Sequence, residues 1–123
     1  LLRAADGLDV TFHRAFDEVR DQIQSLQCLL KFKQIKRILA SGGKDSALRA
    51  VSQFRQLMSL TENSDMAIMA GGGLRIDSLQ EFLQQTSVKE LHFGSAVRRD
   101  DDYFQPIQGE KVRAVKRTVD QFT

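Results

Sequence analysis

The chain has 123 residues, of which 41% are hydrophobic and 28% are charged. These values are typical of one soluble globular unit and exclude a disordered or fibrous chain. Lysine and arginine total 18 against 16 aspartate and glutamate, and the signs are interleaved, so the net charge of +2 indicates no nucleic-acid partner. One cysteine excludes an intrachain disulfide and predicts a reducing, cytoplasmic location. No apolar stretch reaches the roughly 18 residues of a membrane span, so no membrane partner is expected.

Predicted strands and helices alternate along the chain. Residues 8–13 alternate apolar and polar side chains with the period of a strand, and residues 19–32 carry the apolar stripe of a helix. Three further apolar runs predict strands, and each is followed by a predicted helix. The strands are 35–40, 66–70 and 90–93, and the apolar helix positions are Ala47, Val51, Phe54 and Met58, then Leu79, Phe82 and Leu83, then Val112, Val115, Val119 and Phe122.

Two helix starts carry predicted caps. Asp45 or Ser46 is expected to cap the second helix, and residues 78–81, with sequence SLQE, predict a capping box for the third. Strand, loop and helix thus repeat four times, at intervals of roughly 24 to 30 residues, as expected when each helix returns the chain to a parallel strand.

The polar residues of the outer strands favour one parallel architecture over another. An open sheet covered by helices on both faces is apolar on both faces, whereas here polar side chains share one face: Asp9, Thr11, His13, Glu90 and His92. A complete barrel needs about 200 to 250 residues. We therefore predict that residues 1–123 form a single partial domain of the α/β class. It is the C-terminal half of a TIM-type (β/α)8 barrel, with four β/α units, parallel strands and the N-terminal half of the barrel absent. An open sheet is the alternative.

Glycine-rich loops begin where three of the predicted strands end. In either architecture, the ligand site lies beyond the carboxyl ends of the strands. Backbone N–H groups in turns that lead into helices favour an anion such as phosphate. The alternative is that glycines only permit tight turns, since no P-loop pattern is present. The candidate anion-binding residues are Ser41, Gly42, Gly43, Gly71, Gly72, Gly73, His92, Gly94 and Ser95.

Two histidines fall at the ends of the first and last predicted strands. His13 and His92 are expected to point into the barrel, where imidazoles serve acid–base chemistry or a metal. Arg14 and Asp17 could orient His13 or bind an anionic substrate, so His13, Arg14 and Asp17 are the candidate catalytic residues. An Arg–Asp pair that only holds the loop is equally consistent with the sequence.

Four segments resemble, in order, the strand ends of the CutC copper homeostasis family. They are VTFHRAFD at 10–17, ILASGG at 38–43, IMAGGG at 68–73 and LHFGSA at 91–96. The resemblance covers nearly the whole chain but only the C-terminal half of the family's length. It implies a (β/α)8-type barrel, a cytoplasmic location and a role in copper handling, with copper as a possible cofactor. The cysteines discussed as copper ligands in family members belong to the absent half, and Cys28 matches none of them.

The donor atoms and the resemblance point to different ligands. Copper(I) prefers thiolates or thioethers, whereas the predicted mouth offers imidazole, guanidinium, hydroxyl and backbone N–H groups. Cys28 and Met58 lie on predicted helices and are expected in the core. Metal ligands are therefore not identified, and whether the protein is an enzyme stays open.

Two main functions follow. One is a CutC-type copper homeostasis protein that binds copper or a small ligand at the C-terminal mouth of the barrel. The other is a barrel enzyme acting on a small phosphorylated or anionic substrate; a non-catalytic scaffold is a third reading. Since four units leave unpaired strand edges, a homo-oligomer is expected.

Overall fold

The structure of the chain is a computed structural model. It describes residues 4, 7–13, 16, 21–41 and 50–122. Several residues singled out by the sequence lie outside these ranges: Arg14, Asp17, Gly42, Gly43, Asp45, Ser46 and Ala47.

Four parallel strands form one sheet in the order in which they occur in the chain. They are β1 (Val10–Phe12), β2 (Ile35–Ala40), β3 (Ala67–Ala70) and β4 (Glu90–Leu91). The register pairs Phe12 with Ile38, Ile38 with Ile68, and Ala70 with Leu91. This arrangement confirms the predicted α/β class with parallel strands.

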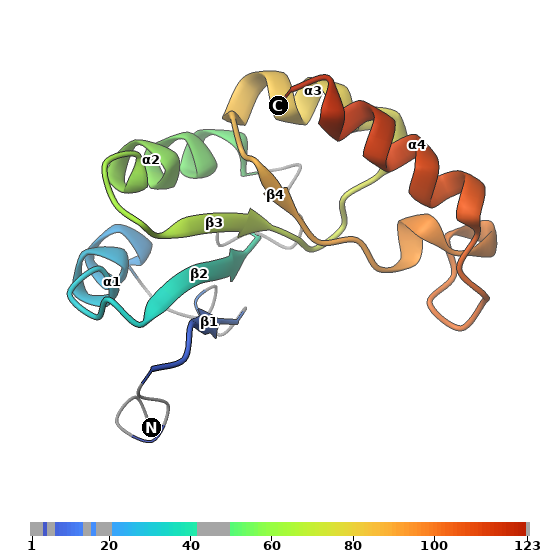
Figure 1. The fold of residues 1–123 in the computed structure, drawn as a ribbon. Coiled ribbons are helices and arrows are strands. Elements are labelled where there is room, and N and C mark those ends of the chain that lie inside the picture. The colour runs from blue at the N-terminus through green and yellow to red at the C-terminus, as the bar shows by residue number, and fades with distance from the viewer. Residues whose placement is uncertain (1–3, 5–6, 14–15, 17–20, 42–49, 123) are drawn as a thin grey trace.

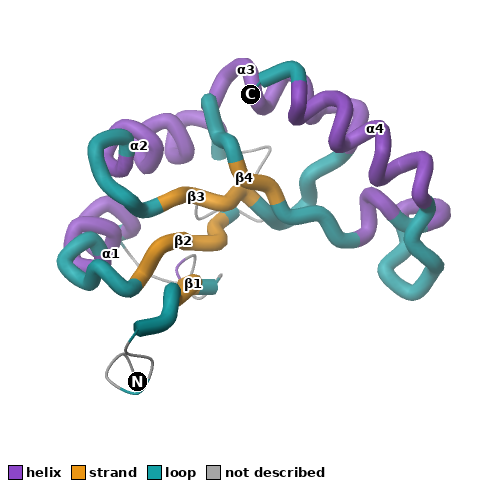
Figure 2. Tube along the Cα trace, viewed as in Figure 1, coloured by secondary structure: helices purple, strands orange, loops and turns teal. Residues whose placement is uncertain are grey.

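Helices separate the strands, as Figure 2 shows along the trace. The α-helices are α1 (Gln22–Leu29), α2 (Val51–Thr61), α3 (Leu79–Thr86) and α4 (Gly109–Asp120), and the short 3₁₀ turns are η3 (Ile76–Ser78), η4 (Ser95–Val97) and η5 (Arg99–Asp101). Helix α1 begins after Asp21 because the Asp21 carboxylate accepts a hydrogen bond from the Gln24 N–H at 3.0 Å. None of the helices in the described part is long and apolar enough to cross a bilayer.

The sheet has one covered face and one open face. Figure 1 shows α1 and α2 along the same side of the strands. On the covered face, Ile38, Ala40, Ile68 and Ala70 are buried in the core. The alternate positions of β2 and β3 are only partly buried: Arg37, Leu39, Ala67 and Met69. This alternation agrees with the prediction that the strands have two different faces, and the open face corresponds to the inner face of a barrel.

Two phenylalanines join the second and third helices. Phe54 of α2 and Phe82 of α3 are 0% and 2% exposed, and their rings meet edge to face with centroids 5.5 Å apart. Such a pair adds to the apolar area that it buries. The helix layer is therefore fixed at this contact.

The predicted capping box at residues 78–81 is wrong. Ser78 caps no backbone N–H through its side chain, and its Oγ is buried with no hydrogen-bond partner. The reason is that η3 runs directly into α3, so that the Leu79 N–H donates to Ile76 O instead. The backbone of Ser78 consequently lacks the extended conformation that a capping residue needs.

Two other helix predictions need correction. Cys28 was expected in the core but is exposed on α1. Met58, also expected in the core, is partly buried on α2 and packs against the core as predicted. At α4, Val115, Val119 and Phe122 pack against the core, although Phe122 lies just beyond the end of the helix. Val112, in contrast, is 44% exposed. The apolar face of α4 is thus only partly covered by the described chain.

Candidate functional site

The residues that follow the parallel strands line one end of the sheet. Ser41, Gly71 and His92 come directly after β2, β3 and β4. The Gly71 N–H donates to Ala40 O at 3.0 Å, and the His92 N–H donates to Ala70 O at 2.8 Å. The ladder therefore continues one residue past the strands and holds Gly71 and His92 side by side.

The backbone of Gly71 approaches the His92 side chain closely. A Cβ atom on Gly71 would lie 2.9 Å from Leu39 Cδ1 and 3.2 Å from His92 Cβ. Glycine is therefore needed here for the close approach of the two strand ends. The Gly71 N–H, predicted as an anion donor, is already bonded within the sheet, which leaves Gly72 and Gly73 as the donors of this turn.

Gly72 and Gly73 adopt positive φ angles of 96° and 73°, a region that glycine enters without steric cost. They lead to the three-residue turn η3, and α3 begins only at Leu79. The turn thus leads towards α3, as predicted, but it does not enter the helix directly, because a short 3₁₀ turn intervenes. The dipole of α3 consequently contributes little at the glycines, since its effect is confined to the first turn.

Gly94 and Ser95 follow β4 in the chain, and Gly94 lies beside an aromatic ring that the sequence did not single out. A Cβ atom on Gly94 would lie 3.2 Å from Tyr103 Cε2. The Arg98 guanidinium carbon sits 5.7 Å from the centroid of the Tyr103 ring. Tyr103 is 64% exposed, so one of its faces is open to solvent next to the mouth. The sequence could not predict this contact, because Tyr103 lies in a polar loop that has no helix or strand periodicity.

His13 and His92 occupy the predicted strand ends and are both exposed. The His13 ring stacks on Phe12, with centroids 6.0 Å apart. The two histidines follow β1 and β4, which are the opposite edges of the sheet. Three strand spacings separate them, up to about 14 Å across a flat sheet. Within one chain they therefore do not meet, and Arg14 and Asp17 lie outside the described residues.

The part of the chain that the structure describes lacks a full set of metal ligands. No group of three or more His, Cys, Asp or Glu side chains that could hold a metal occurs there. Cys28, the one thiol, is exposed on α1 and does not directly follow any of the strands. These residues do not by themselves fit a copper(I) site, which prefers soft sulfur ligands.

An ion pair crosses the open face of the sheet. Arg37 of β2 is the register partner of Ala67 on β3, and its side chain reaches past that strand to Glu90 of β4. Its Nη2 donates to Glu90 Oε1 at 3.0 Å, and its Nε donates to Oε2. The small side chain of Ala67 leaves room for this crossing. Periodicity placed Glu90 on this face, but it could not predict a partner two strands away.

The Arg37–Glu90 pair makes stability depend on pH. The hydrogen bond from Arg37 lowers the pKa of Glu90 from its ordinary value of 4.5, with burial opposing the shift. A lowered folded-state pKa stabilises the fold above the unfolded pKa, and that contribution is lost as pH falls through the folded value. We expect Glu90→Gln to lower the melting temperature at pH 7. The corresponding loss in the free energy of unfolding should be no more than about 1 kcal/mol, because solvent screens the pair.

The measurement is a pair of melting curves for the two proteins from pH 7 to pH 3. The difference between them should narrow as the pH falls below 4.5, the ordinary pKa of a glutamate, and through the lowered pKa of Glu90. Arg75→Gln, which removes an exposed ion pair with Asp77, is the matched control and should change little. A gap between Glu90→Gln and the parent protein that stays constant down to pH 3 would contradict the assignment.

Comparison with known proteins gives the family. The profile of the CutC family matches residues 1–97. The chain belongs to the CutC family. A CutC family protein of Pasteurella multocida (strain Pm70) is 41% identical over 92 residues, covering 75% of this chain and 37% of that protein. The copper homeostasis protein cutC homolog of Dictyostelium discoideum is 31% identical over 117 residues, covering 81% and 42%.

A solved CutC structure shows the same fold. The CutC protein of Streptococcus agalactiae superposes with a TM-score of 0.66 at 32% identity, covering 75% of this chain and 45% of that one. The chain therefore spans about two fifths of the length of its curated CutC relatives and is part of a TIM-barrel fold. The family match ends at Val97, earlier than the resemblance in the sequence predicted.

Proposed function

We propose that this chain acts in copper homeostasis as part of a CutC-type barrel, and that a small ligand binds at its C-terminal mouth. The observation that carries the proposal is the contact between His92 and Gly71, which places an exposed imidazole beside a glycine turn. Family membership supports the copper role. A cytoplasmic location, expected from the single cysteine, belongs to the same proposal.

The donors of the mouth favour an anion over copper. The His92 imidazole and the turn at Gly72 and Gly73 can donate hydrogen bonds, whereas the described residues of the mouth contain no thiol. The second candidate is therefore an enzyme site for a small phosphorylated or anionic substrate. In that case His13 or His92 would act as the general acid or base, and Arg14 would bind the negatively charged group of the substrate.

Two titrations separate these candidates. Copper(I), buffered by a competing chelator, and inorganic phosphate are added separately to the parent chain, His92→Ala and His13→Ala. For the anion site, we expect His92→Ala to weaken phosphate binding by about tenfold, the worth of one charge-assisted hydrogen bond, with unchanged copper affinity. For a copper site, the copper affinity should fall instead.

The control for these titrations is Cys28→Ser. Cys28 is exposed on α1 and could capture copper without any role of the mouth. Cys28→Ser should abolish only the copper binding that depends on this thiol and should leave binding at the mouth unchanged. If neither histidine substitution changes the affinity for copper or for phosphate, the mouth is not a ligand site and the proposal fails.

We also propose that residues 1–123 form one partial barrel domain that associates with a second copy. The sheet ends at β1 and β4, two short edge strands, and its open face carries half-buried apolar side chains such as Leu39 and Met69. The backbone N–H and C=O groups along an uncovered sheet edge can pair with another chain. Analytical ultracentrifugation should show a dimer, and a monomer with one cooperative melt at micromolar concentration would contradict the association.

A further inference from the structure

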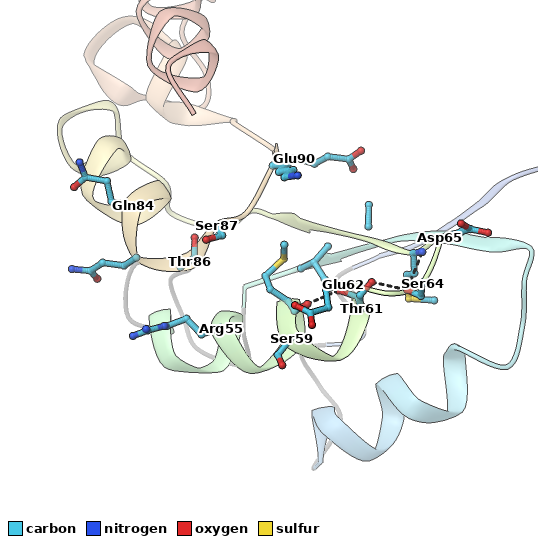
Figure 3. Close-up of a pocket in the computed structure, with 16 residues that line it drawn as sticks. Arg55, Ser59, Thr61, Glu62, Ser64, Asp65, Gln84, Thr86, Ser87 and Glu90 are labelled. Carbon is cyan, nitrogen blue, oxygen red and sulfur yellow. Dashed lines mark hydrogen bonds between the residues drawn. The ribbon is translucent and has the colours of Figure 1, made fainter. Parts of the chain in front are cut away.

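A cavity of about 700 Å³ lies at the opposite end of the strands from the mouth. Figure 3 shows it between the end of α2, the end of α3 and the start of β4. It exists because β3 and β4 pair only at Met69–Glu90 and Ala70–Leu91. Towards their amino ends the two strands separate, and Ala67 and Lys89 line the open space. Its volume lies within the range of small-molecule sites.

Two helices end at this cavity. Helix α2 ends at Thr61 and α3 at Thr86, and both residues line the cavity. Neither helix has a basic residue in its last turn. The carbonyl end of a helix carries a partial negative charge. Lys89 follows Thr86 by three residues and already places a positive charge in the lining near the end of α3. A positively charged ligand group would therefore be stabilised chiefly at the end of α2.

The hydroxyl groups at these helix ends are already used. The Thr61 hydroxyl donates to Leu57 O at 3.0 Å, and the Thr86 hydroxyl donates to Phe82 O at 2.8 Å. Both bonds point back into their own helices. The Thr61 and Thr86 hydroxyl groups therefore have no proton left to donate to a ligand, and the charged side chains of the lining are the strongest groups available to select one.

Those charged side chains are separated along the cavity. Figure 3 shows Arg55 on one side of the cavity and Asp65 on the other side. Glu62 lies seven positions after Arg55, two turns along α2 or about 10 Å. Among the described residues, Arg55, Glu62 and Asp65 form no ion pair with one another. Lys89 and Glu90 also line the cavity, and Glu90 is already bonded to Arg37. The positive charges of Arg55 and Lys89 and the negative charges of Glu62 and Asp65 are therefore left for a ligand among the described residues.

We propose that this cavity binds a zwitterionic ligand whose amine and carboxylate are about 10 Å apart, the span of a short extended peptide of three residues. The amine lies by Glu62 and Asp65, at the end of α2, and the carboxylate lies by Arg55. The site is independent of the mouth, because its residues lie at the amino ends of β3 and β4. It therefore does not depend on the proposed function.

Triglycine is the probe, with its N-acetylated and C-amidated forms as matched ligands. Binding to the parent chain is followed by ¹H–¹⁵N NMR titration. We expect triglycine to shift backbone signals of Thr61, Glu62 and Ser87, which surround the cavity. Each blocked form should bind at least about fivefold more weakly, because each loses one charged contact in a partly solvated site.

Two substitutions of exposed side chains assign the two ends. Glu62→Gln should weaken triglycine and the C-amidated form but not the N-acetylated form. Arg55→Gln should weaken triglycine and the N-acetylated form but not the C-amidated form. Both residues are exposed, so the fold should be unaffected, and Glu110→Gln on α4 is the matched control. Absence of shifts at these signals at millimolar triglycine, or binding that is indifferent to blocking and to both substitutions, overturns the proposal.

Discussion

Phe82→Ala is expected to lower the free energy of unfolding by about 3 to 5 kcal/mol, the usual result of removing a buried aromatic ring. Phe82 is 2% exposed and meets the fully buried Phe54 edge to face at 5.5 Å. The substitution removes this contact and leaves a cavity between α2 and α3, the two helices that cover β3. Urea denaturation followed by circular dichroism measures the loss.

Phe104→Ala is the matched control for Phe82→Ala. Phe104 is 95% exposed, so the same chemical change should alter stability by about 0.5 kcal/mol or less. Phe82→Leu, which keeps most of the apolar volume, should fall between the two and serves if Phe82→Ala does not fold. Equal losses for Phe82→Ala and Phe104→Ala would contradict the packing described here.

Gly71→Val is the substitution expected to disturb the mouth most. Its Cβ would lie 2.9 Å from Leu39 Cδ1 and 3.2 Å from His92 Cβ, and the γ-methyl groups add further crowding. Overpacking of this kind costs about 1 to 3 kcal/mol. The His92 side chain should move away from the strand end. Its imidazole NMR signals should therefore shift, and the ligand affinity of the mouth should fall with them.

Gly109→Ala provides the contrast, because a Cβ there would come no nearer than 3.4 Å to the end of the Arg113 side chain. Gly109 is the first residue of α4, where alanine favours the helix by up to about 1 kcal/mol. We expect a neutral or stabilising effect, with unchanged His92 signals. Destabilisation by Gly109→Ala equal to that by Gly71→Val would show that space at the strand end is not the cause.

Local patterns in the sequence predicted the elements because each pattern has a local physical origin. The apolar run at residues 35–40 and the alternation at 8–13 reflect which side chains face the core, and both became strands. Strand order also followed, since consecutive β/α units place consecutive strands side by side. The family resemblance, confirmed over residues 1–97, rests on the glycine and histidine positions at the strand ends.

Features that depend on contacts between distant residues were not predicted. The Arg37–Glu90 pair joins strands 53 residues apart in sequence, and Tyr103 reaches Gly94 only because its loop folds back. The buried Ser78 hydroxyl shows the same limit at short range, because the competing turn η3 changed the backbone at the expected cap. The cavity beside Glu62 arises from the divergence of two strands, which no single segment encodes.

The loop after β4 closes on itself. The Gln108 N–H donates to Val97 O at 2.8 Å and the Arg99 N–H donates to Pro106 O at 3.0 Å, so the entry and exit of the loop are fastened to each other. Its tip, with Phe104 almost fully exposed, lies beyond the segment shared with the family. The tip can therefore change length without changing the spacing between β4 and α4, which makes it a suitable insertion point for a fluorescent label that reports on the mouth.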